Sequence, residues 1–504
     1  MSNNLQKMAR SVYAQLLRNI YPVILLICSF GIYFTYYGSP GAMFWDENYH
    51  VASAEKHIQG VMYMEPHPPL GKMLMAAAEV VIAPNKNIDK HRFVETDHIE
   101  GADTPPGTQF TGYRWPSVIL MAVSVLFFFG ILNRITRQPL LAFLFSSFII
   151  FDNALVIQAR AAMLEGIQLF FILAELYCFT RIITSQRAIT LKDYALLGVL
   201  IGLAMSVKVT SAIELLLFVV LFGVDQWKNI RAFNYGALIK RLLVAVPSGV
   251  LPVILVFLSV FYIHVGMGTK VIPGHTYKAS PEYLHAIQSG NTWSPSTFAV
   301  GMRDNWKYMS EYADGVPRLD ECKPDENGSY PMNWLLGKKT ISYRWDKDTI
   351  DGKVEVRYMT IIANPIIWFS VVAGIVLSIG LIMSKFIYGQ KEKDTPLFNW
   401  ICVFTGLYLS YMIAILQIER VMYLYHYLIP LVFGSINLSL VFNYIYREEI
   451  LANSKHLWVN LSLYIALVIA IFAFFAPFTY GIGMTADQFE LRNWFSFWKL
   501  QAVQ

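Results

Sequence analysis

The sequence predicts an all-α, polytopic membrane protein, and three observations lead to this fold class. Hydrophobic residues make up 55% of the 504 positions and charged residues only 15%, which is too apolar for a soluble globular protein of this length. Apolar runs long enough to cross a bilayer as helices recur along the chain. Lysine and arginine gather between these runs. We expect about eleven transmembrane helices and two long exported loops that contain amphipathic surface helices.

The expected spans follow one another from the N-terminus with short connections, apart from the two long loops. They lie at 20–38, 114–132, 140–157, 161–180, 194–208, 211–224, 242–264, 361–383, 397–416, 421–442 and 457–475. The spans 194–208 and 211–224 are short, and each carries one charged residue, Lys208 and Glu214. We treat residues 1–475 as one transmembrane domain and residues 476–504 as an exported amphipathic tail that rests on the membrane surface.

Basic residues mark every second connection. They are Lys7, Arg10, Arg18, Arg134, Arg137, Arg181, Arg187, Lys192, Lys228, Arg231, Lys240, Arg241, Lys385, Lys391, Lys393, Arg447 and Lys455. The positive-inside rule therefore places the N-terminus and these connections in the cytoplasm. The loops 39–113 and 265–360 are then exported. Because both are much longer than ordinary connections, we expect the first to be catalytic and the second to bind substrate.

The loop 39–113 begins with two adjacent acids, Asp46 and Glu47, where the first span leaves the bilayer. Such a pair is costly unless it has partners or faces a wet cavity, so it is either a solvated loop end or part of an active site. The pattern predicts surface helices over 47–58 and 70–82, separated by a His-Pro-Pro sequence that breaks a helix. Lys72 opens the second helix and either snorkels or binds a lipid phosphate.

Other charges lie close to predicted membrane boundaries. Arg160 lies in the short turn between the third and fourth spans, where it either forms an internal ion pair with Asp152 or Glu165 or contributes to a site. Arg114 opens the second span and either snorkels or binds a ligand. His426 lies among tyrosines, where a histidine is more often a hydrogen-bonded core residue than a ligand.

Four segments carry a resemblance to one family. The acidic pair followed by HPPLGK (67–72), the stretch 149–165, GLAMSVKVTS (202–211) and ERVMYLYHYLIP (419–430) resemble the motifs of the protein O-mannosyltransferases. The resemblance covers nearly the whole chain. The sequence departs from the family pattern at Trp45, where Phe is usual, and at Ala159 and Glu165, where Ser and Asp are usual.

The resemblance implies a glycosyltransferase C fold of the bacterial type without the extra soluble domain, in a plasma membrane with the active site on the exported face. It implies an inverting transfer of a sugar, mannose in this family, from a polyprenyl-phosphate carrier to Ser/Thr hydroxyls of exported proteins, with the secretion translocon as a further partner. We expect Asp46 to be the general base and Glu47 to orient the acceptor or, with Asp46, to bind a divalent cation. The other predicted residues are Lys72, Arg114, Arg160 and Arg420 for the donor phosphate, and His50, His67, Lys208, Tyr425 and His426 as further pocket candidates.

Two alternatives remain open. The first is a transferase that moves a lipid-linked sugar onto a glycolipid such as lipid A. The second is a solute transporter, which the absence of an internal repeat disfavours. The sequence contains no G-x-G-x-x-G or P-loop motif, which argues against a nucleotide-sugar donor. Nucleic acid is excluded as a partner because the net charge of +5 comes largely from the cytoplasmic connections.

Overall fold

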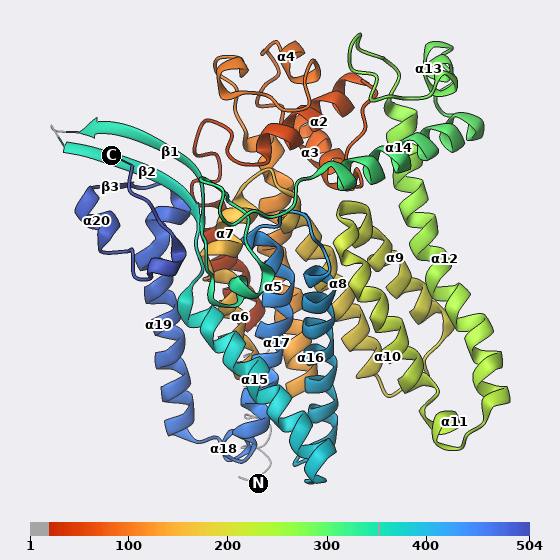
Figure 1. The fold of residues 1–504 in the computed structure, drawn as a ribbon. Coiled ribbons are helices and arrows are strands. Elements are labelled where there is room, and N and C mark those ends of the chain that lie inside the picture. Colours follow the sequence, from red (N-terminus) through yellow and green to blue (C-terminus); the bar gives the residue numbers. More distant parts are fainter. Residues whose placement is uncertain (1–19, 351–352, 504) are drawn as a thin grey trace, which may run out of the picture.

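The computed structural model describes residues 20–350 and 353–503 and shows a bundle of roughly parallel helices beneath a layer of shorter elements (Figure 1). The long apolar helices are Thr111–Thr136 (α5), Leu164–Ile183 (α8), Tyr235–Met267 (α12), Pro365–Tyr388 (α15), Thr395–Leu416 (α16), Leu428–Ile445 (α17) and Lys455–Tyr480 (α19). The shorter helices of the bundle are Ile20–Phe34, Pro139–Ile150 (α6), Asn153–Arg160 (α7), Leu191–Val207 (α9) and Leu216–Asp225 (α10). The mainly helical, multi-pass architecture is therefore as predicted.

The predicted count of eleven spans is not confirmed. Among the described residues, seven helices are long and apolar enough to cross a membrane, or eight if the bent pair α6 and α7 is one span. Each predicted span is helical, but some are short. The span expected at 211–224 is divided between the 3-10 helix Val209–Leu215 (η2) and α10. The basic residues Lys7, Arg10 and Arg18 lie outside the described residues.

The predicted span 140–157 is broken into two helices, and we attribute the break to Asp152. Helices α6 and α7 meet at an angle of 59°. The Asp152 carboxylate caps α7 by accepting a hydrogen bond from the Leu155 N–H at 2.9 Å, and it accepts another from Trp368 Nε1 at 2.8 Å. Asp152 is therefore not the partner of Arg160 that we considered above.

The first long loop folds as its pattern predicts, with helices Glu47–Gln59 (α2) and Leu70–Ile82 (α3). The helix α2 does not lie on a membrane surface, however, because its central residues are buried within the protein on every side. Glu55 forms an ion pair with Lys90 at 2.7 Å. The Lys56 ammonium donates a hydrogen bond at 2.7 Å to the hydroxyl of Tyr277 in the second long loop. The two long loops are thus packed against each other.

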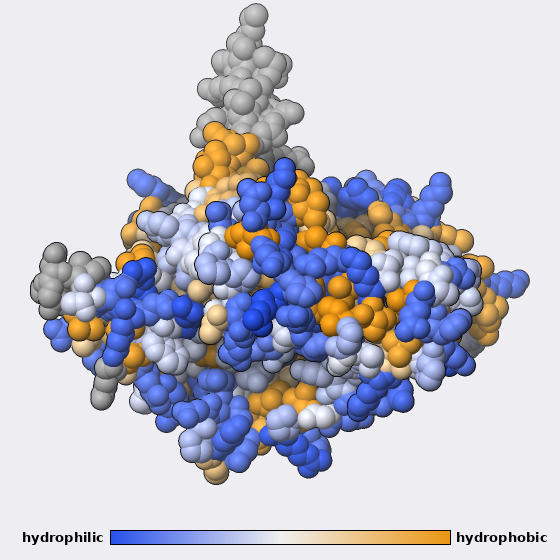
Figure 2. Space-filling view, turned by 90° about the horizontal axis from the view of Figure 1, so that it is seen from above, coloured by the Kyte–Doolittle hydropathy of each residue, from blue (hydrophilic) through white to orange (hydrophobic). Residues whose placement is uncertain are grey.

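Loop 265–360 contains structure that the sequence did not predict. Strands Ile341–Ile350 (β1) and Lys353–Ile361 (β2) form an antiparallel hairpin that projects from the layer (Figure 1). Helices Pro281–Gln288 (α13) and Pro295–Gly315 (α14) lie at the other side of the same layer. Seen from above, this face is mostly hydrophilic, with hydrophobic patches between the polar areas (Figure 2).

The tail beyond residue 475 is part of the protein body rather than a separate surface segment. The short strand Gly483–Met484 (β3) pairs with β2, and Trp498 is fully buried. Two backbone N–H groups, those of Lys339 and Thr340, donate to the carbonyls of Phe497 and Trp498. Burial of this aromatic tail, rather than contact with lipid alone, accounts for its apolar residues.

Candidate active site

The two adjacent acids at the start of α2 have different surroundings, and Glu47 lies in the more enclosed one. Glu47 and Arg114 are both fully buried, and they form a bidentate pair at 2.7 and 2.8 Å. The Glu47 carboxylate also accepts hydrogen bonds from the backbone N–H groups of Ala162 at 2.7 Å and Phe44 at 3.2 Å. Glu47 therefore connects the start of loop 39–113 to α5 and to the turn after α7.

Arg114 and Arg160 also donate hydrogen bonds to backbone carbonyl groups. Arg114 donates to the carbonyls of Pro40 and Ala42 at 2.8 Å each, and more weakly to Tyr37 at 3.4 Å. Arg160 donates to the carbonyls of Thr35 (3.1 Å), Tyr36 and Thr479 (2.6 Å), and its guanidinium lies over the Tyr480 ring. We call Glu47, Arg114 and Arg160 the anchoring cluster.

This geometry argues against three of the predicted roles. Every nitrogen of the buried Arg114 and Arg160 guanidinium groups already donates to a protein acceptor, so we infer that these residues anchor the fold rather than bind the phosphate. Arg160 also does not pair with Asp152 or Glu165. Glu47 points at Arg114 and not toward the carboxylate of Asp46, so the two acids do not form the divalent-cation site considered above. No group of three or more His, Cys, Asp or Glu suited to a metal occurs within 20–350 and 353–503.

Asp46 has the opposite environment. It precedes α2 but does not cap it, and its carboxylate has one long contact, from the Tyr425 hydroxyl at 3.5 Å. Burial and the charge of Glu165 raise the pKa of Asp46 to about 6, against the opposing effects of Lys208, Tyr425 and Lys72. A carboxylate with this pKa and little internal hydrogen bonding can accept a proton from a bound hydroxyl.

The backbone before Asp46 helps to separate the two acids. Trp45 adopts a φ of 54°, which is uncommon for a residue other than glycine and typical of functional sites. Its ring packs against Tyr343 at 5.0 Å and Tyr423 at 5.4 Å between centroids. These contacts hold the turn from which Asp46 and Glu47 point to different surroundings.

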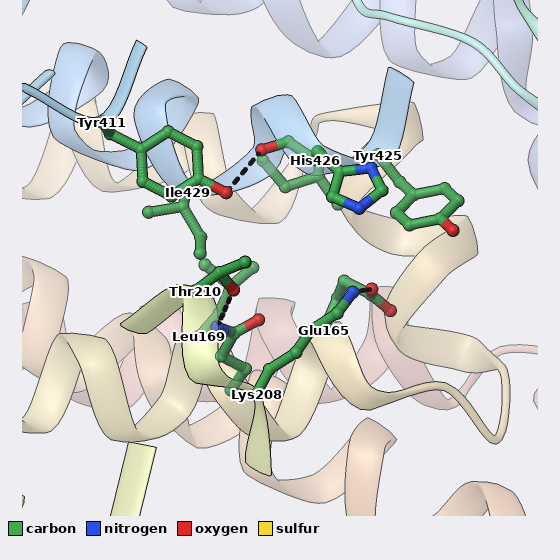
Figure 3. A pocket seen from close by; sticks show the side chains of 10 residues that line it. Glu165, Leu169, Lys208, Thr210, Tyr411, Tyr425, His426 and Ile429 are labelled. Atoms are coloured by element: carbon green, nitrogen blue, oxygen red, sulfur yellow. Dashed lines mark hydrogen bonds and ion pairs between the residues drawn. The ribbon is translucent and has the colours of Figure 1, made fainter. Parts of the chain in front are cut away.

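A polar pocket lies between the start of α8 and the segment Leu424–Tyr427 (Figure 3). Figure 3 shows Tyr425 and His426 on one side of it and Glu165 and Lys208 on the other. The Lys208 ammonium pairs with Glu165 at 2.6 Å and lies 5.3 Å from the centre of the Tyr425 ring. We call Asp46, Glu165, Lys208, Tyr425 and His426 the pocket cluster.

Two residues that sequence reasoning missed support this cluster. Gln158 donates to Glu165 at 2.9 Å and accepts from the Tyr343 hydroxyl at 2.7 Å. Gln158 lies in the QAR part of a family motif, and Tyr343 lies in an aromatic segment of the second loop. Those patterns marked the residues as notable, but only the fold reveals that they touch Glu165.

Lys72 is buried rather than snorkelling. Its ammonium forms an ion pair with Glu65, an acid two residues before the His-Pro-Pro motif that sequence reasoning also missed. Gly71 allows this close packing, because a Cβ there would lie 2.5 Å from the Leu164 side chain. The helix α3 thus brings Lys72 next to the start of α8.

Two histidines of the first loop, His50 and His67, remain neutral. Burial, then the charge of Lys72, lowers the pKa of His50 to about 3, and its Nδ1 donates to the Ala162 carbonyl at 2.9 Å. Burial lowers the pKa of His67 well below its usual value, and the charges of Lys208, Lys72 and Arg420 lower it further. His67 therefore reports a region of positive potential, which suits an anionic ligand.

Arg420 is partly exposed and precedes Tyr425 and His426 in the chain. No ion pair of its side chain is recorded in the part of the chain that the structure describes, so its donors are available. His426 is held by a hydrogen bond from its ring Nδ1 to the Tyr423 carbonyl at 3.0 Å and stacks on the Tyr425 ring at 4.6 Å. His426 is consequently fixed, whereas Arg420 can reach a ligand.

An apolar groove of about 460 Å³ adjoins the polar pocket. Its walls come from α9, α12 and α14, and include Met205, Val209, Val253, Phe257, Met302 and Trp306. Lys208 and Thr210 line the polar pocket, and Val209 between them lines the groove. One short segment therefore separates a polar site from a lipid-like one.

Comparison with known proteins identifies two adjoining family regions. Residues 23–267 match the dolichyl-phosphate-mannose-protein mannosyltransferase model, and residues 305–498 match the C-terminal four-transmembrane region of protein O-mannosyltransferases.

Among curated relatives, the chain is 28% identical over 160 residues to dolichyl-phosphate-mannose–protein mannosyltransferase 4 of Schizosaccharomyces pombe, which covers 32% of this chain and 20% of that protein. It is 26% identical over 187 residues to dolichyl-phosphate-mannose–protein mannosyltransferase 1 of Candida albicans, covering 36% of this chain and 20% of that protein. The chain thus matches only about a fifth of the length of these relatives.

The fold is similar to a chain of the Saccharomyces cerevisiae protein O-mannosyltransferase Pmt1–Pmt2 complex bound to the sugar donor. The TM-score is 0.78 at 15% identity, over 97% of this chain and 93% of that one. The two family regions cover the chain except for its ends and residues 268–304, and the whole fold agrees with them. The chain belongs to the protein O-mannosyltransferase family.

Proposed function

We propose that the protein transfers mannose from a polyprenyl-phosphate carrier to Ser/Thr hydroxyls of exported proteins. The observation that carries this proposal is Asp46: its carboxylate is nearly free of internal hydrogen bonds and lies beside Lys208 and Tyr425. The family to which the chain belongs and the names of its relatives support the same donor and acceptor.

In this mechanism Asp46 takes the proton of the acceptor hydroxyl as the hydroxyl oxygen attacks the anomeric carbon of the sugar. The bond from that carbon to the phosphate oxygen breaks, and the polyprenyl phosphate leaves with the bonding electrons. Lys208, Lys72 and Arg420 neutralise the leaving phosphate, because the charges of all three act on the same position of the first loop, His67. The single displacement inverts the anomeric centre.

The apolar groove supports a lipid-linked donor. A polyprenyl chain in the groove would leave the phosphate at Lys208, since residues 208 and 209 line the two sites in turn. Glu47, Arg114 and Arg160 would position the catalytic loop without touching the donor. We further propose that the site faces the non-cytoplasmic side of a bacterial plasma membrane, where acceptors emerge from the translocon.

The test supplies polyprenyl-phosphate mannose and an exported Ser/Thr-rich peptide to the purified protein in vesicles. We expect transfer by the wild type, loss of transfer with Asp46→Asn, and no change with the matched control Asp103→Asn, an exposed acid of the same loop. Transfer to glycolipid but not to peptide would favour a glycolipid transferase instead. Wild-type transfer by Asp46→Asn would remove Asp46 from the role of base.

A further inference from the structure

A line of polar residues leads from the pocket cluster into the membrane-spanning bundle. Glu165, Gln168 and Glu175 lie at i, i+3 and i+10 of α8, a spacing that places them on one face of the helix. Glu165 pairs with Lys208 at 2.6 Å, and Gln168 donates to Thr210 at 2.9 Å. Gln168 also donates to Ser211 at 2.8 Å.

We call this line the polar seam. Its members lie on two facing elements, α8 and the α9–η2 segment. Its members are Glu165, Gln168 and Glu175 on α8, and Lys208, Thr210, Ser211 and Glu214 on the opposite segment. The first two steps of the seam are satisfied by the bonds described above. The third step, formed by Glu175 and Glu214, is not.

Glu175 and Glu214 are both completely buried, and all four of their carboxylate oxygens lack a hydrogen-bond partner within the described residues. Both lie where α8 packs against η2 and α10, and the Gln168–Ser211 hydrogen bond already holds η2 to α8. The titratable groups that face them are Cys178 on α8 and Tyr411 on α16, and neither supplies a positive charge. Burying two ionised carboxylates in such surroundings would cost several kcal/mol for each one. A positive charge must therefore compensate them.

We propose that Glu175 and Glu214 form a proton-binding site which, while protonated, holds η2 against α8 and so sets the position of Lys208. The same two elements carry the Lys208–Glu165 ion pair at the other end of the seam, only six residues from Glu214. Ionisation of the pair would create repulsion between α8 and η2, and that repulsion would act directly on the segment that positions Lys208.

A proton fits this site better than a metal ion does. Magnesium and calcium require six or more oxygen ligands, whereas the pair offers two carboxylates and belongs to no larger group of metal-binding side chains within 20–350 and 353–503. A bound proton neutralises a buried carboxyl group, which removes the cost of burying its charge without any further ligand.

The first experiment is independent of the proposed function. The purified protein in vesicles is treated with a membrane-soluble carbodiimide, which adds to protonated carboxyl groups, or with a water-soluble carbodiimide as the control reagent. We expect the membrane-soluble reagent alone to modify Glu175 or Glu214, with modification falling as the pH is raised from about 6 to about 10. Absence of modification at every pH, or its suppression by sodium or magnesium instead of by pH, would overturn the proposal.

The second experiment tests the effect on Lys208 and rests on the proposed transfer activity. The double variant Glu175→Gln, Glu214→Gln keeps the shape of the pair but cannot ionise, and Glu448→Gln at an exposed position is the matched control. At alkaline pH we expect the double variant to retain about fivefold more of its neutral-pH activity than the wild type, the low end of coupling between separate sites. Equal losses in both proteins would reject the link to Lys208. If the protein shows no transfer at all, the proposed function fails, while the labelling result still decides the proton site.

Discussion

The anchoring cluster and the pocket cluster lie side by side, begin at adjacent residues and use the same kinds of side chain, yet they differ in what remains unsatisfied. Glu47 has four protein donors at 3.2 Å or less, whereas Asp46 has one contact at 3.5 Å. A buried charge whose hydrogen bonds are all internal stabilises a geometry, and a charge left open can act on a ligand. The difference separates residues that hold the site from residues that perform the reaction.

Replacing Glu47 should have the largest effect on stability. Glu47→Ala leaves the buried Arg114 guanidinium unpaired, and breaking such a pair costs about 3–5 kcal/mol. We expect a large fall in thermal stability and in yield. Asp46→Ala, one residue away, should unfold at nearly the wild-type temperature, and equal destabilisation by both would erase the distinction between the clusters.

Lys208→Met should weaken binding of the donor, and it should also lower stability because Glu165 loses its partner. A hydrogen bond to a charged group contributes about 1.5–3 kcal/mol, so the KM for the lipid-linked sugar should rise about 10- to 100-fold. Because the variant also leaves Glu165 unpaired, the double variant Lys208→Met, Glu165→Gln is the control for stability. A normal KM in the double variant would show that Lys208 does not contact the donor.

The pH dependence of transfer should report Asp46. The base acts in its ionised form and its pKa is about 6, so kcat/KM should rise with pH through about 6 and stay high until the alkaline range in which the proposed Glu175 and Glu214 site ionises. Glu165→Gln removes a negative charge that raises this pKa and leaves Lys208 unpaired nearby. Both changes favour the ionised base, and the rising limb should therefore move to lower pH. A shift to higher pH would contradict the arrangement of charges.

Tyr425→Phe should have the smallest effect. It removes a contact of 3.5 Å, which is at the limit of a hydrogen bond, while the ring that lies beside Lys208 stays in place. We expect a change in kcat/KM of about twofold with unchanged stability. A loss as large as that of Asp46→Asn would mean that the hydroxyl touches the substrate.

Much of the local structure was predictable, because it depends on periodicity and on residues that break helices. The helices α2 and α3 begin and end within one residue of the ranges that the pattern predicted, on either side of the His-Pro-Pro break. The β1–β2 hairpin was not predicted, although polar and apolar residues alternate over 341–346 and 353–358 as in a strand, because we treated this loop only as a substrate-binding segment. The buried tail was also missed, because an apolar tail can rest on lipid or on protein, and its sequence does not distinguish them.

The sequence alone determined that the chain is a multi-pass membrane protein, and its motifs alone pointed to the family. Only the tertiary structure decided which charged side chains have their hydrogen-bond partners within the protein and which remain available to a ligand. Arg114 and Arg160 looked like phosphate ligands, but their nitrogens donate to carbonyls far away in the chain. Glu165, one of the two acids considered as a partner for Arg160, instead pairs with Lys208. Hydrogen-bond partners are set by which segments meet in space, and spacing along the chain does not contain that information.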